Sequence, residues 1–342
     1  MGDNALRPKH FIRSAKKGVL LDVRTPAEFA QGHIPGAINF PLFSNEERAE
    51  IGTLYKQESR EAAIDRGFEI VGPKMADWIK TAREKFAEQD LHIHCWRGGM
   101  RSANMAWLFT TAGFVCFTLR GGYKAYRQMV LKDLMAPWRF IVLGGYTGSG
   151  KTDLLHHLQQ KGEQVIDLEK IANHRGSAFG QIGEQPTSEQ FANLLHAELS
   201  QLDPEQPIWI EDESRLIGKV YLPDEFMQLK RESPLLFMQL PQEERAQYLA
   251  EQYGKIPVAT LKASFQQIKK RLGDAKVQEA LEALDRGDIT RAAAIALHYY
   301  DKAYVHSLRK HTKHKIKMVS FPKMDIDHMA NQLMEEAKTT IP

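Results

Sequence analysis

Cysteine is nearly absent from the chain, and long apolar runs are missing. The 342 residues contain two cysteines, Cys95 and Cys116, which excludes a disulfide framework and favours a reducing compartment. No segment approaches the roughly 18 apolar residues that a membrane-spanning helix needs, and no apolar leader follows the first basic residues. We therefore expect a cytoplasmic protein with no membrane partner, in which a special cysteine is special for its reactivity.

An excess of charge of one sign is also lacking. The net charge of +3 does not by itself indicate a nucleic-acid partner, because opposite charges on different faces cancel in the sum. The run RKHTKHKIK, however, contains no acidic residue. Its cations are either phosphate contacts or an ordinary solvated face. They are Arg309, Lys310, Lys313, Lys315 and Lys317.

The first half of the chain alternates short apolar runs with helical patterns. GVLLDVR predicts a strand, and Thr25, Pro26 and Glu28 after it predict a helix that begins with a capping box. The elements expected next are a short strand in GHIPGAINFP, helices over about 46–85, a strand in LHIHC, a helix from near Ser102, and a strand with a helical tail in FVCFTLRGGYKAYR.

A second α/β unit begins at RFIVLGGYTGSGKT, where an apolar strand runs into a glycine-rich turn. QVIDLE and PIWIEDES are expected to be strands that end in acidic residues, and the sequence from Pro223 onward predicts mainly helices. We predict a first domain at residues 1–131, a linker at 132–138, and a second domain at 139–342 with a helical, partly basic C-terminal region.

The stretch HCWRGGMRS places a cysteine before a turn that carries two glycines and two arginines. Backbone N–H groups of such a turn bind anions, and Arg97 and Arg101 would stabilise the Cys95 thiolate, which is the reactive form. We predict that these three residues are catalytic. The residues expected to form the anion cradle around them are Trp96, Gly98, Gly99 and Met100.

Two alternatives to this interpretation remain open at this point. Five residues separate Cys95 from Arg101, a spacing found in cysteine phosphatases as well as in sulfur transferases. Cys95 could instead be a buried structural cysteine, which is the commoner fate of the residue type. For Cys116, inside the apolar run FVCFTL, we expect core packing.

GYTGSGKT fits the pattern G-x-x-x-x-G-K-[ST] of a phosphate-binding P-loop, with a strand before it and a helix after it. Its N–H groups would hold a diphosphate or triphosphate, Lys151 would reach an outer phosphate, and Thr152 would bind Mg²⁺. The residues expected to bind phosphate are Gly145, Gly148, Ser149, Gly150, Lys151 and Thr152.

Acidic and polar residues follow the other predicted strands of the second domain. PIWIEDE is similar to a Walker B strand, and Asp212 or Glu211 would complete a Mg²⁺ site with Thr152; a solvated strand end is the alternative. Ligands bind at the carboxyl edge of open α/β sheets. The candidates expected there are Asp167, Glu169, His174, Arg175, Ser177, Glu211, Asp212, Glu213 and Arg215.

The first half resembles the rhodanese homology domain over residues 10 to about 130. LLDVRTPAEFAQGHIPGAINFP, HCWRGGMRS and LRGGYKAYR carry this resemblance. It implies that the cysteine carries a persulfide or a related chalcogen between partners. The loop here is one residue longer between Cys95 and Arg101 than is usual in that family. A wider cradle would suit a phosphate or a bulkier chalcogen donor.

Over nearly the whole length, the chain resembles the bacterial tRNA 2-selenouridine synthase family. The motifs that carry this resemblance are NEERAEIGTLYKQ, HCWRGGMRS, GYTGSGKT, DLEKIANHRGSAFG and WIEDESRLIG. The fold implied is α/β: a rhodanese-like domain followed by a P-loop NTPase-like parallel-sheet domain with a helical C-terminal part. The reaction implied takes place at a thiolated wobble uridine of tRNA. Geranyl diphosphate first alkylates its sulfur, and selenium from selenophosphate then replaces the S-geranyl group.

The resemblance assigns a role to each motif. The P-loop would hold geranyl diphosphate, while Cys95 would bind selenophosphate or carry selenium as a perselenide. No redox cofactor is expected, and the partners implied are tRNA and the enzyme that produces selenophosphate. The basic run would contact tRNA. The tyrosines that would either stack on an unpaired base or pack in the core are Tyr299, Tyr300 and Tyr304.

Two other functions fit parts of the sequence. A rhodanese-fold cysteine phosphatase, or a sulfurtransferase coupled to a nucleotide-binding P-loop domain, would account for the cysteine loop and its spacing. A nucleotide-binding regulatory module, or a P-loop kinase with a sulfur-carrier appendage, would account for the second half. The first predicts release of phosphate from aryl phosphates, and the second predicts ATP binding with no change in cellular tRNA.

Overall fold

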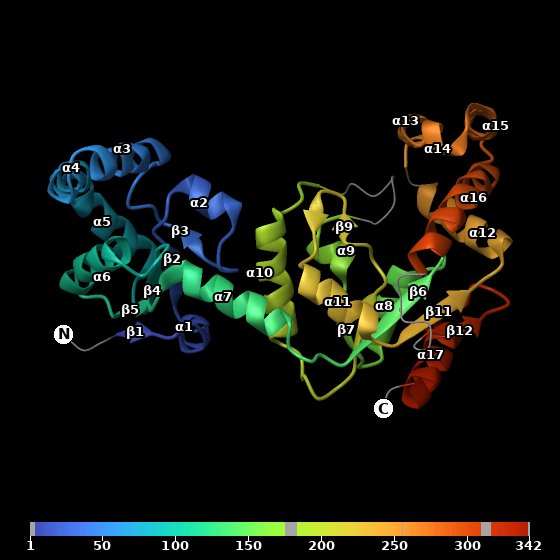
Figure 1. Cartoon of the computed structure of the whole chain (residues 1–342), viewed down its shortest axis with the longest axis horizontal. Helices are drawn as coiled ribbons and strands as arrows, with labels where there is room; N and C mark the ends of the chain where they lie inside the picture. The colour runs from blue at the N-terminus through green and yellow to red at the C-terminus, as the bar shows by residue number, and fades with distance from the viewer. Residues whose placement is uncertain (1–3, 175–182, 255, 309–315, 341–342) are drawn as a thin grey trace. The chain divides into compact units, whose positions relative to one another are not determined.

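The structure is a computed structural model that describes residues 4–174, 183–254, 256–308 and 316–340 (Figure 1). The chain divides into two compact units. The first is Met1–Asp133 together with Ala192–Ala197, and the second is Leu134–Phe191 with Glu198–Pro342. Each unit is built around its own five-stranded sheet, as the predicted α/β fold requires.

The first unit is built on a parallel sheet with strand order β1-β5-β4-β2-β3. Its elements are β1 Ala5–Leu6, α1 Pro8–Ala15, β2 Val19–Asp22, α2 Pro26–Gln31, β3 Ile38–Asn39, α3 Asn45–Gln57, α4 Arg60–Val71, η1 Gly72–Lys74, α5 Met75–Phe86, β4 Leu91–His94, α6 Met100–Thr111, β5 Cys116–Leu119 and α7 Gly122–Leu134.

Local signals in the sequence explain several of these elements. The predicted capping box is confirmed: Thr25 accepts a hydrogen bond from the Glu28 N–H, and the Glu28 side chain accepts one from the Thr25 N–H. Cys116 is buried in the apolar core around β2 and β4, as expected. Helix α6 begins at Met100, two residues earlier than Ser102. Helix α7 continues through Leu134, so the first residues of the segment 132–138 are helical.

The second unit contains a parallel sheet with strand order β12-β11-β6-β8-β7. Its elements are β6 Phe140–Gly145, α8 Lys151–Gln160, β7 Gln164–Ile166, α9 Leu168–Ile171, α10 Ser188–Leu199, β8 Ile208–Glu211, β9 Leu216–Ile217, β10 Val220–Tyr221, α11 Asp224–Glu232, β11 Leu235–Gln239, α12 Gln242–Tyr253, α13 Val258–Gln267, α14 Lys269–Leu272, α15 Asp274–Asp285, α16 Ile289–Leu308, β12 Ile316–Ser320 and α17 Ile326–Thr340.

The chain after Pro223 is mainly helical, as predicted, but it also contains two strands of this sheet, β11 and β12, that were not predicted. β11 pairs with both β6 and β12 in parallel register, so it lies inside the sheet. Its residues Leu235, Leu236, Phe237 and Met238 are all buried. A strand covered on both faces has no alternating pattern, so periodicity does not separate it from a buried helix. β11 was not predicted from the sequence for that reason.

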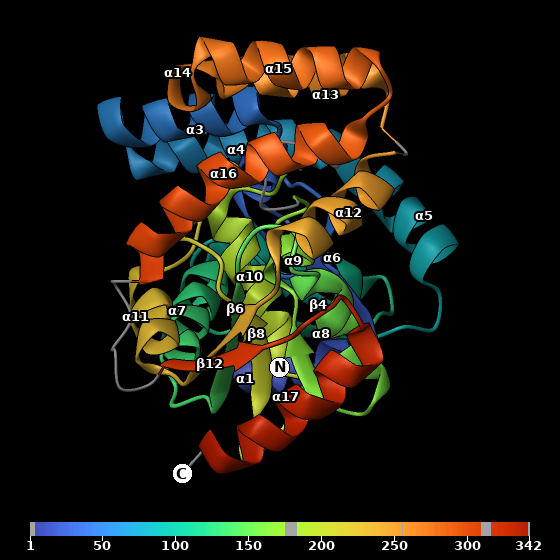
Figure 2. The same ribbon diagram turned by 90° about the vertical axis from the view of Figure 1, so that its right-hand side faces the viewer.

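The helical part of the second unit lies after β11. Helices α12 and α16 pack side by side, and α13 to α15 form a small core with α16 (Figure 2). Tyr299 and Tyr300 are partly buried against that core, as the core alternative predicted for them; the side chain of Tyr304 lies outside the described residues. Among the helices that the structure describes, none is long and apolar enough to cross a bilayer.

Candidate active sites

Cys95 directly follows β4, next to β2 in the sheet. The chain leaves β2 toward β3 and returns to β4 on the other side of β2, and ligands bind at such switch points of open sheets. The cysteine is free and 3% exposed. Its Sγ lies 3.2 Å from the Ser102 Oγ. The loop thus presents a reduced sulfur in contact with one hydroxyl.

Glycines give the Cys95 loop, residues 95–101, its shape. Gly98 has φ +67°, and Gly122, at the start of α7, has φ +62°. A Cβ on Gly122 would lie 2.4 Å from the Cys95 O and 2.4 Å from the Gly98 N. Hydrogen bonds from the Tyr123 N and Lys124 N to the Cys95 O and Trp96 O, at 2.8 Å and 2.9 Å, close this contact. The motif LRGGYKAYR therefore supports the Cys95 loop through these hydrogen bonds and through the close packing of Gly122.

Gly122→Ala should disrupt this support. The added methyl group requires the loop to move and also strains a left-handed backbone, so we expect a loss of roughly 1–3 kcal/mol beyond the strain alone. Gly36→Ala is the control, because Gly36 has φ +82° and nothing within 4 Å of its Cβ position. Thermal unfolding and the alkylation rate of Cys95 measure the effect. Equal losses in the two variants would contradict it.

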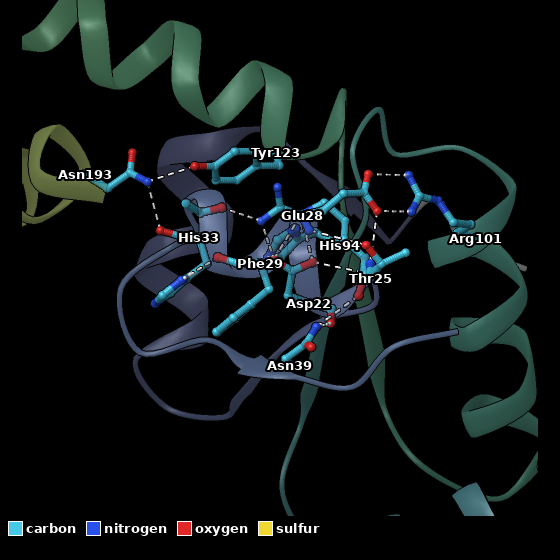
Figure 3. Close-up of polar contacts among 12 residues, drawn as sticks. Asp22, Thr25, Glu28, Phe29, His33, Asn39, His94, Arg101, Tyr123 and Asn193 are labelled. Atoms are coloured by element: carbon cyan, nitrogen blue, oxygen red, sulfur yellow. Dashed lines mark hydrogen bonds and ion pairs between the residues drawn. The ribbon is translucent and has the colours of Figure 1, made fainter. Parts of the chain in front are cut away.

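The two arginines of the loop have different environments. Arg101 donates to both carboxylate oxygens of Glu28, at 2.7 Å and 3.2 Å, and Figure 3 shows the two groups facing each other. Burial would raise the pKa of Glu28, but the hydrogen bonds and charge of Arg101 outweigh it and lower that pKa. Arg97 is exposed and makes no ion pair with the described residues. The Arg101 side chain is thus held in place by Glu28, whereas the Arg97 guanidinium is available to a bound anion.

A buried polar network lies beside the loop (Figure 3). Arg24 is 1% exposed, donates to Asp22 at 2.6 Å, and places its guanidinium 3.8 Å from the centroid of the Tyr123 ring. Burial, with the nearby positive charge of Arg24, lowers the pKa of His94 to about 4 despite Asp22 at 3.7 Å. His94 is therefore neutral at neutral pH.

Helix α10 contributes one residue to this network. Asn193 lies in the Ala192–Ala197 stretch that belongs to the first unit. Its side chain donates to the His33 O and the Tyr123 Oη, both at 2.9 Å. The Trp96 ring lies 5.7 Å from the Tyr123 ring, and Trp96 and Met100 are 37% and 51% exposed. The loop thus carries two partly exposed apolar side chains, Trp96 and Met100.

In the second unit, the P-loop connects β6 to α8 at the carboxyl edge of the sheet. Gly148 and Gly150 adopt φ +79° and φ +71°, which the loop conformation requires. Lys151 donates to the Gly145 O at 3.1 Å, closing the loop on itself. The Ser149 Oγ is buried without a partner among the described residues. The phosphate-binding residues predicted from GYTGSGKT are therefore brought together in one loop.

The helical part of the same unit holds the P-loop. Arg245 of α12 is 4% exposed, donates to the Thr147 O at 3.1 Å, and makes two 2.8 Å hydrogen bonds to Asp301 of α16. A Cβ on Gly148 would lie 2.9 Å from the Arg245 O. Arg245 and Asp301 could not be predicted from the sequence, because no local motif connects them to a loop that lies so far away along the chain.

Three carboxylates gather beside the P-loop. One oxygen each of Glu169, Glu211 and Glu213 lies within 4.8 Å of the others. Glu211 is fully buried, and neither of its oxygens has a hydrogen-bond partner among the described residues. The Thr152 Oγ1 donates to Glu169 at 3.1 Å. Burial, and then the charges of the other acids, raise the pKa of Glu211 well above its ordinary value.

Asp212, which the sequence favoured as the metal ligand, is paired differently. Its carboxylate lies 3.5 Å from the ammonium of Lys230, a fully buried lysine of α11. Lys230 also donates to the carbonyl oxygens of Glu211, at 3.3 Å, and of Glu213. Lys230 therefore holds the backbone of residues 211 and 213 in place. The carboxylates beside Thr152 are those of Glu169 and of Glu211 and Glu213, the two neighbours of Asp212.

Of the remaining candidates, Asp167 lies near the carboxylate cluster, where its charge helps to raise the pKa of Glu211. Asp167 caps α9 and lies 2.8 Å from His156, and the His174 N donates to the Glu169 O at 3.0 Å. Arg215 forms an exposed ion pair with Asp224. Lys317 lies on β12, paired with Glu336 and donating to Thr339 at 2.9 Å. The candidates outside the described residues are Arg175, Ser177, Arg309, Lys310, Lys313 and Lys315.

A cysteine loop of the rhodanese type and a P-loop, each on its own parallel sheet, define a two-domain group-transfer enzyme. Residues 9–129 match the family described as "Rhodanese-like domain", and residues 138–259 match "tRNA 2-selenouridine synthase AAA domain". The chain belongs to the tRNA 2-selenouridine synthase family. The α/β fold and the enzyme class expected from the sequence are thereby confirmed.

Curated relatives carry the same family name. A tRNA 2-selenouridine synthase of Aeromonas salmonicida is 33% identical over 329 residues, covering 84% of this chain and 87% of the relative. One of Nitrosomonas europaea is 39% identical over 247 residues, covering 68% and 63%. One of Hydrogenovibrio crunogenus is 36% identical over 303 residues, covering 81% and 82%.

Proposed function

We propose that the chain converts a thiolated wobble uridine of tRNA to 2-selenouridine in two stages. In the first stage, the uridine sulfur attacks the geranyl group of geranyl diphosphate, and diphosphate leaves. In the second stage, selenium supplied by selenophosphate replaces the S-geranyl group. The observation that carries the proposal is the presence, in one chain of this family, of a P-loop and of a free cysteine within an anion cradle.

The P-loop is the proposed site of geranyl diphosphate. Its backbone would cradle the two phosphates, and Lys151 would exchange the Gly145 carbonyl for a phosphate oxygen. No nucleotide hydrolysis is needed in this scheme, because the diphosphate is itself the leaving group. Alkylation in turn makes the uridine sulfur a better leaving group for the second stage.

The carboxylate cluster fits a Mg²⁺ ion beside the P-loop. Both oxygens of Glu211 are buried and have no hydrogen-bond partner in the part of the chain that the structure describes, and Mg²⁺ prefers oxygen ligands. Glu169, Glu211 and Glu213 would hold the ion, with Thr152 adjacent to Glu169. When bound, the ion would neutralise charge on the departing diphosphate. The three carboxylates would hold the ion at the carboxyl edge of the sheet, beside the P-loop.

Glu211→Gln should separate metal binding from folding. Without metal, the variant should unfold roughly 2–4 °C higher at neutral pH, which is about 1 kcal/mol for a domain of this size, because a neutral amide needs neither a buried charge nor a bound proton at this position. The raised pKa of Glu211 makes the folded wild type hold a proton that the unfolded chain releases near 4.5, so wild-type stability falls as pH rises above that value. The advantage of the variant should grow over the same range.

Mg²⁺ should raise the unfolding temperature of the wild type and leave that of Glu211→Gln unchanged. Titration calorimetry and thermal unfolding measure both effects independently of catalysis. Glu205→Gln is the matched control, because Glu205 is an exposed glutamate outside the cluster. Undiminished Mg²⁺ binding by Glu211→Gln would refute the assignment.

The cradle around Cys95 is the proposed site of selenophosphate, with Arg97 as its exposed cation and Arg101, held by Glu28, as the second. The enzyme that produces selenophosphate is a proposed partner, since it would deliver this substrate. Basic side chains would bind the tRNA backbone, and the run 309–317 remains the candidate segment. Of its cations, Lys317 is already engaged with Glu336.

Mass spectrometry of wobble nucleosides tests the whole proposal. Cells that lack the gene should contain 2-thiouridine derivatives alone, and restoring the wild-type gene with selenium supplied should restore 2-selenouridine. Restoring it without selenium should lead to S-geranyl-2-thiouridine. An unchanged nucleoside profile in all three cultures would overturn the proposed function.

A further inference from the structure

The Cys95 loop offers more hydrogen-bond donors than a selenium atom can use. In the part of the chain that the structure describes, no backbone carbonyl accepts the N–H groups of residues 96 to 99. The loop runs directly into the N-terminus of α6, where further N–H groups are unpaired. Arg97 adds an exposed guanidinium. Such a set of donors matches the three oxygens of a phosphoryl group, whereas selenium is a weak acceptor.

This match favours one orientation of selenophosphate in the cradle. If the donors hold the three oxygens, phosphorus lies above the Cys95 Sγ, and selenium points away from it. The opposite orientation would place selenium on the sulfur but remove the oxygens from the donors.

We propose that Cys95 attacks the phosphorus of selenophosphate, not its selenium, and that the loop releases selenium as hydrogen selenide ion. This inference rests on the proposed function, which supplies selenophosphate as the substrate. The liberated hydrogen selenide ion, held close to the site, attacks C2 of the uridine; the C–Se bond forms, the C–S bond breaks, and geranyl thiolate leaves and takes up the proton. Cys95 is then a phosphoryl acceptor, and it never carries selenium.

The atoms and electrons balance in each of these reaction steps. The thiolate forms an S–P bond, the P–Se bond breaks, and its electron pair leaves on selenium, which retains the proton carried by hydrogen selenophosphate. Water then attacks phosphorus, the S–P bond breaks, and the pair returns to sulfur with release of phosphate. Phosphorus and selenium keep their oxidation states throughout. Attack on selenium would instead leave the electron pair on phosphorus and give phosphite.

Ser102 is placed to stabilise the sulfur in both steps. Its Oγ lies 3.2 Å from the Cys95 Sγ and donates to the Gly99 O at 3.2 Å. The Gly99 O also accepts from the Ala103 N at 3.1 Å, so the hydroxyl can turn to the thiolate without leaving that carbonyl unpaired. Ser102 and Cys95 are 1% and 3% exposed, so bulk water does not readily replace this bond. We assign Ser102 as the donor to the attacking and departing thiolate.

Phosphorus NMR on the full-length enzyme tests the proposal. The wild type is mixed anaerobically with selenophosphate and an S-geranylated thiouridine oligonucleotide. Phosphate should appear in step with 2-selenouridine, and phosphite should not. Phosphite, or selenium bound to Cys95 and chased into the oligonucleotide, would overturn the proposal while leaving the proposed function intact. Normal selenouridine formation by Cys95→Ser would instead remove Cys95 from the second stage, and the proposed function of the loop with it.

The Ser102→Ala variant adds a second readout. Losing a hydrogen bond to the departing thiolate should slow hydrolysis of the S–P bond by roughly tenfold to a hundredfold, so phosphocysteine should accumulate and give its own phosphorus signal. Ser102→Thr keeps the hydroxyl and should restore the wild-type rate. Cys116→Ala is the matched control and should give no new signal. Equal rates in Ser102→Ala and the wild type would contradict the assigned role of Ser102.

Discussion

Cys95→Ser should abolish formation of 2-selenouridine and leave geranylation intact. A serine hydroxyl is far less acidic than a thiol, so at neutral pH the loop would hold no anionic nucleophile. S-Geranyl-2-thiouridine should therefore accumulate in place of the final product. We expect a fall in the selenation rate of roughly a thousandfold or more, which corresponds to about 4 kcal/mol of activation free energy.

Single-turnover assays with purified tRNA would measure this effect. Two reactions are followed separately, geranylation of thiolated tRNA and selenation of tRNA that already carries the S-geranyl group. Cys116→Ala is the control, because Cys116 is buried in the core of β5, on the same sheet. A Cys95→Ser enzyme that selenates at the normal rate would remove Cys95 from the chemistry.

Lys151→Ala should have the complementary effect. The variant loses a charged contact to the diphosphate, worth roughly 1.5–3 kcal/mol, so geranylation should fall about tenfold to a hundredfold. Because the second stage consumes the product of the first, selenouridine should fall with it in cells. Selenation of tRNA that is geranylated beforehand should proceed normally.

Lys161→Ala is the control for this variant. Lys161 caps the other end of α8 and pairs with Asp327 at 2.7 Å, so its loss removes a lysine from the same helix without touching the P-loop. Binding of geranyl diphosphate is measured by calorimetry beside that of ATP. Normal geranylation by Lys151→Ala would place the diphosphate elsewhere, and a loss of ATP affinity alone would favour a nucleotide in the loop.

Local chemistry made much of the fold predictable. A capping box satisfies the first N–H groups of a helix with residues three positions apart, so Thr25 and Glu28 predicted the start of α2 correctly. The same holds for GYTGSGKT, where the glycines, the preceding strand and the following helix are all in one stretch. The strands β11 and β12 were missed because their burial depends on partners distant in the sequence.

The candidate sites divide in the same way. The loop residues 95–101 were predicted as a group, yet the contacts that distinguish Arg97 from Arg101 depend on Glu28, which is 73 residues away. Ser102 was seen only as a helix start, although its hydroxyl touches the reactive sulfur. Beside the P-loop, the sequence could not separate Asp212 from Glu211, because Lys230 decides which of them is paired.

Arg245, which is paired with Asp301 and donates a hydrogen bond to the P-loop, is made long after that loop during synthesis on the ribosome. The loop itself is complete once Thr152 has been made. Arg245 on α12 follows 98 positions after Thr147, and Asp301 on α16 follows 56 positions after Arg245. A nascent chain that stops before α16 carries the whole motif without the groups that hold it in shape. Competence to bind a diphosphate should therefore appear late in translation, well after the cysteine loop of the first unit has emerged.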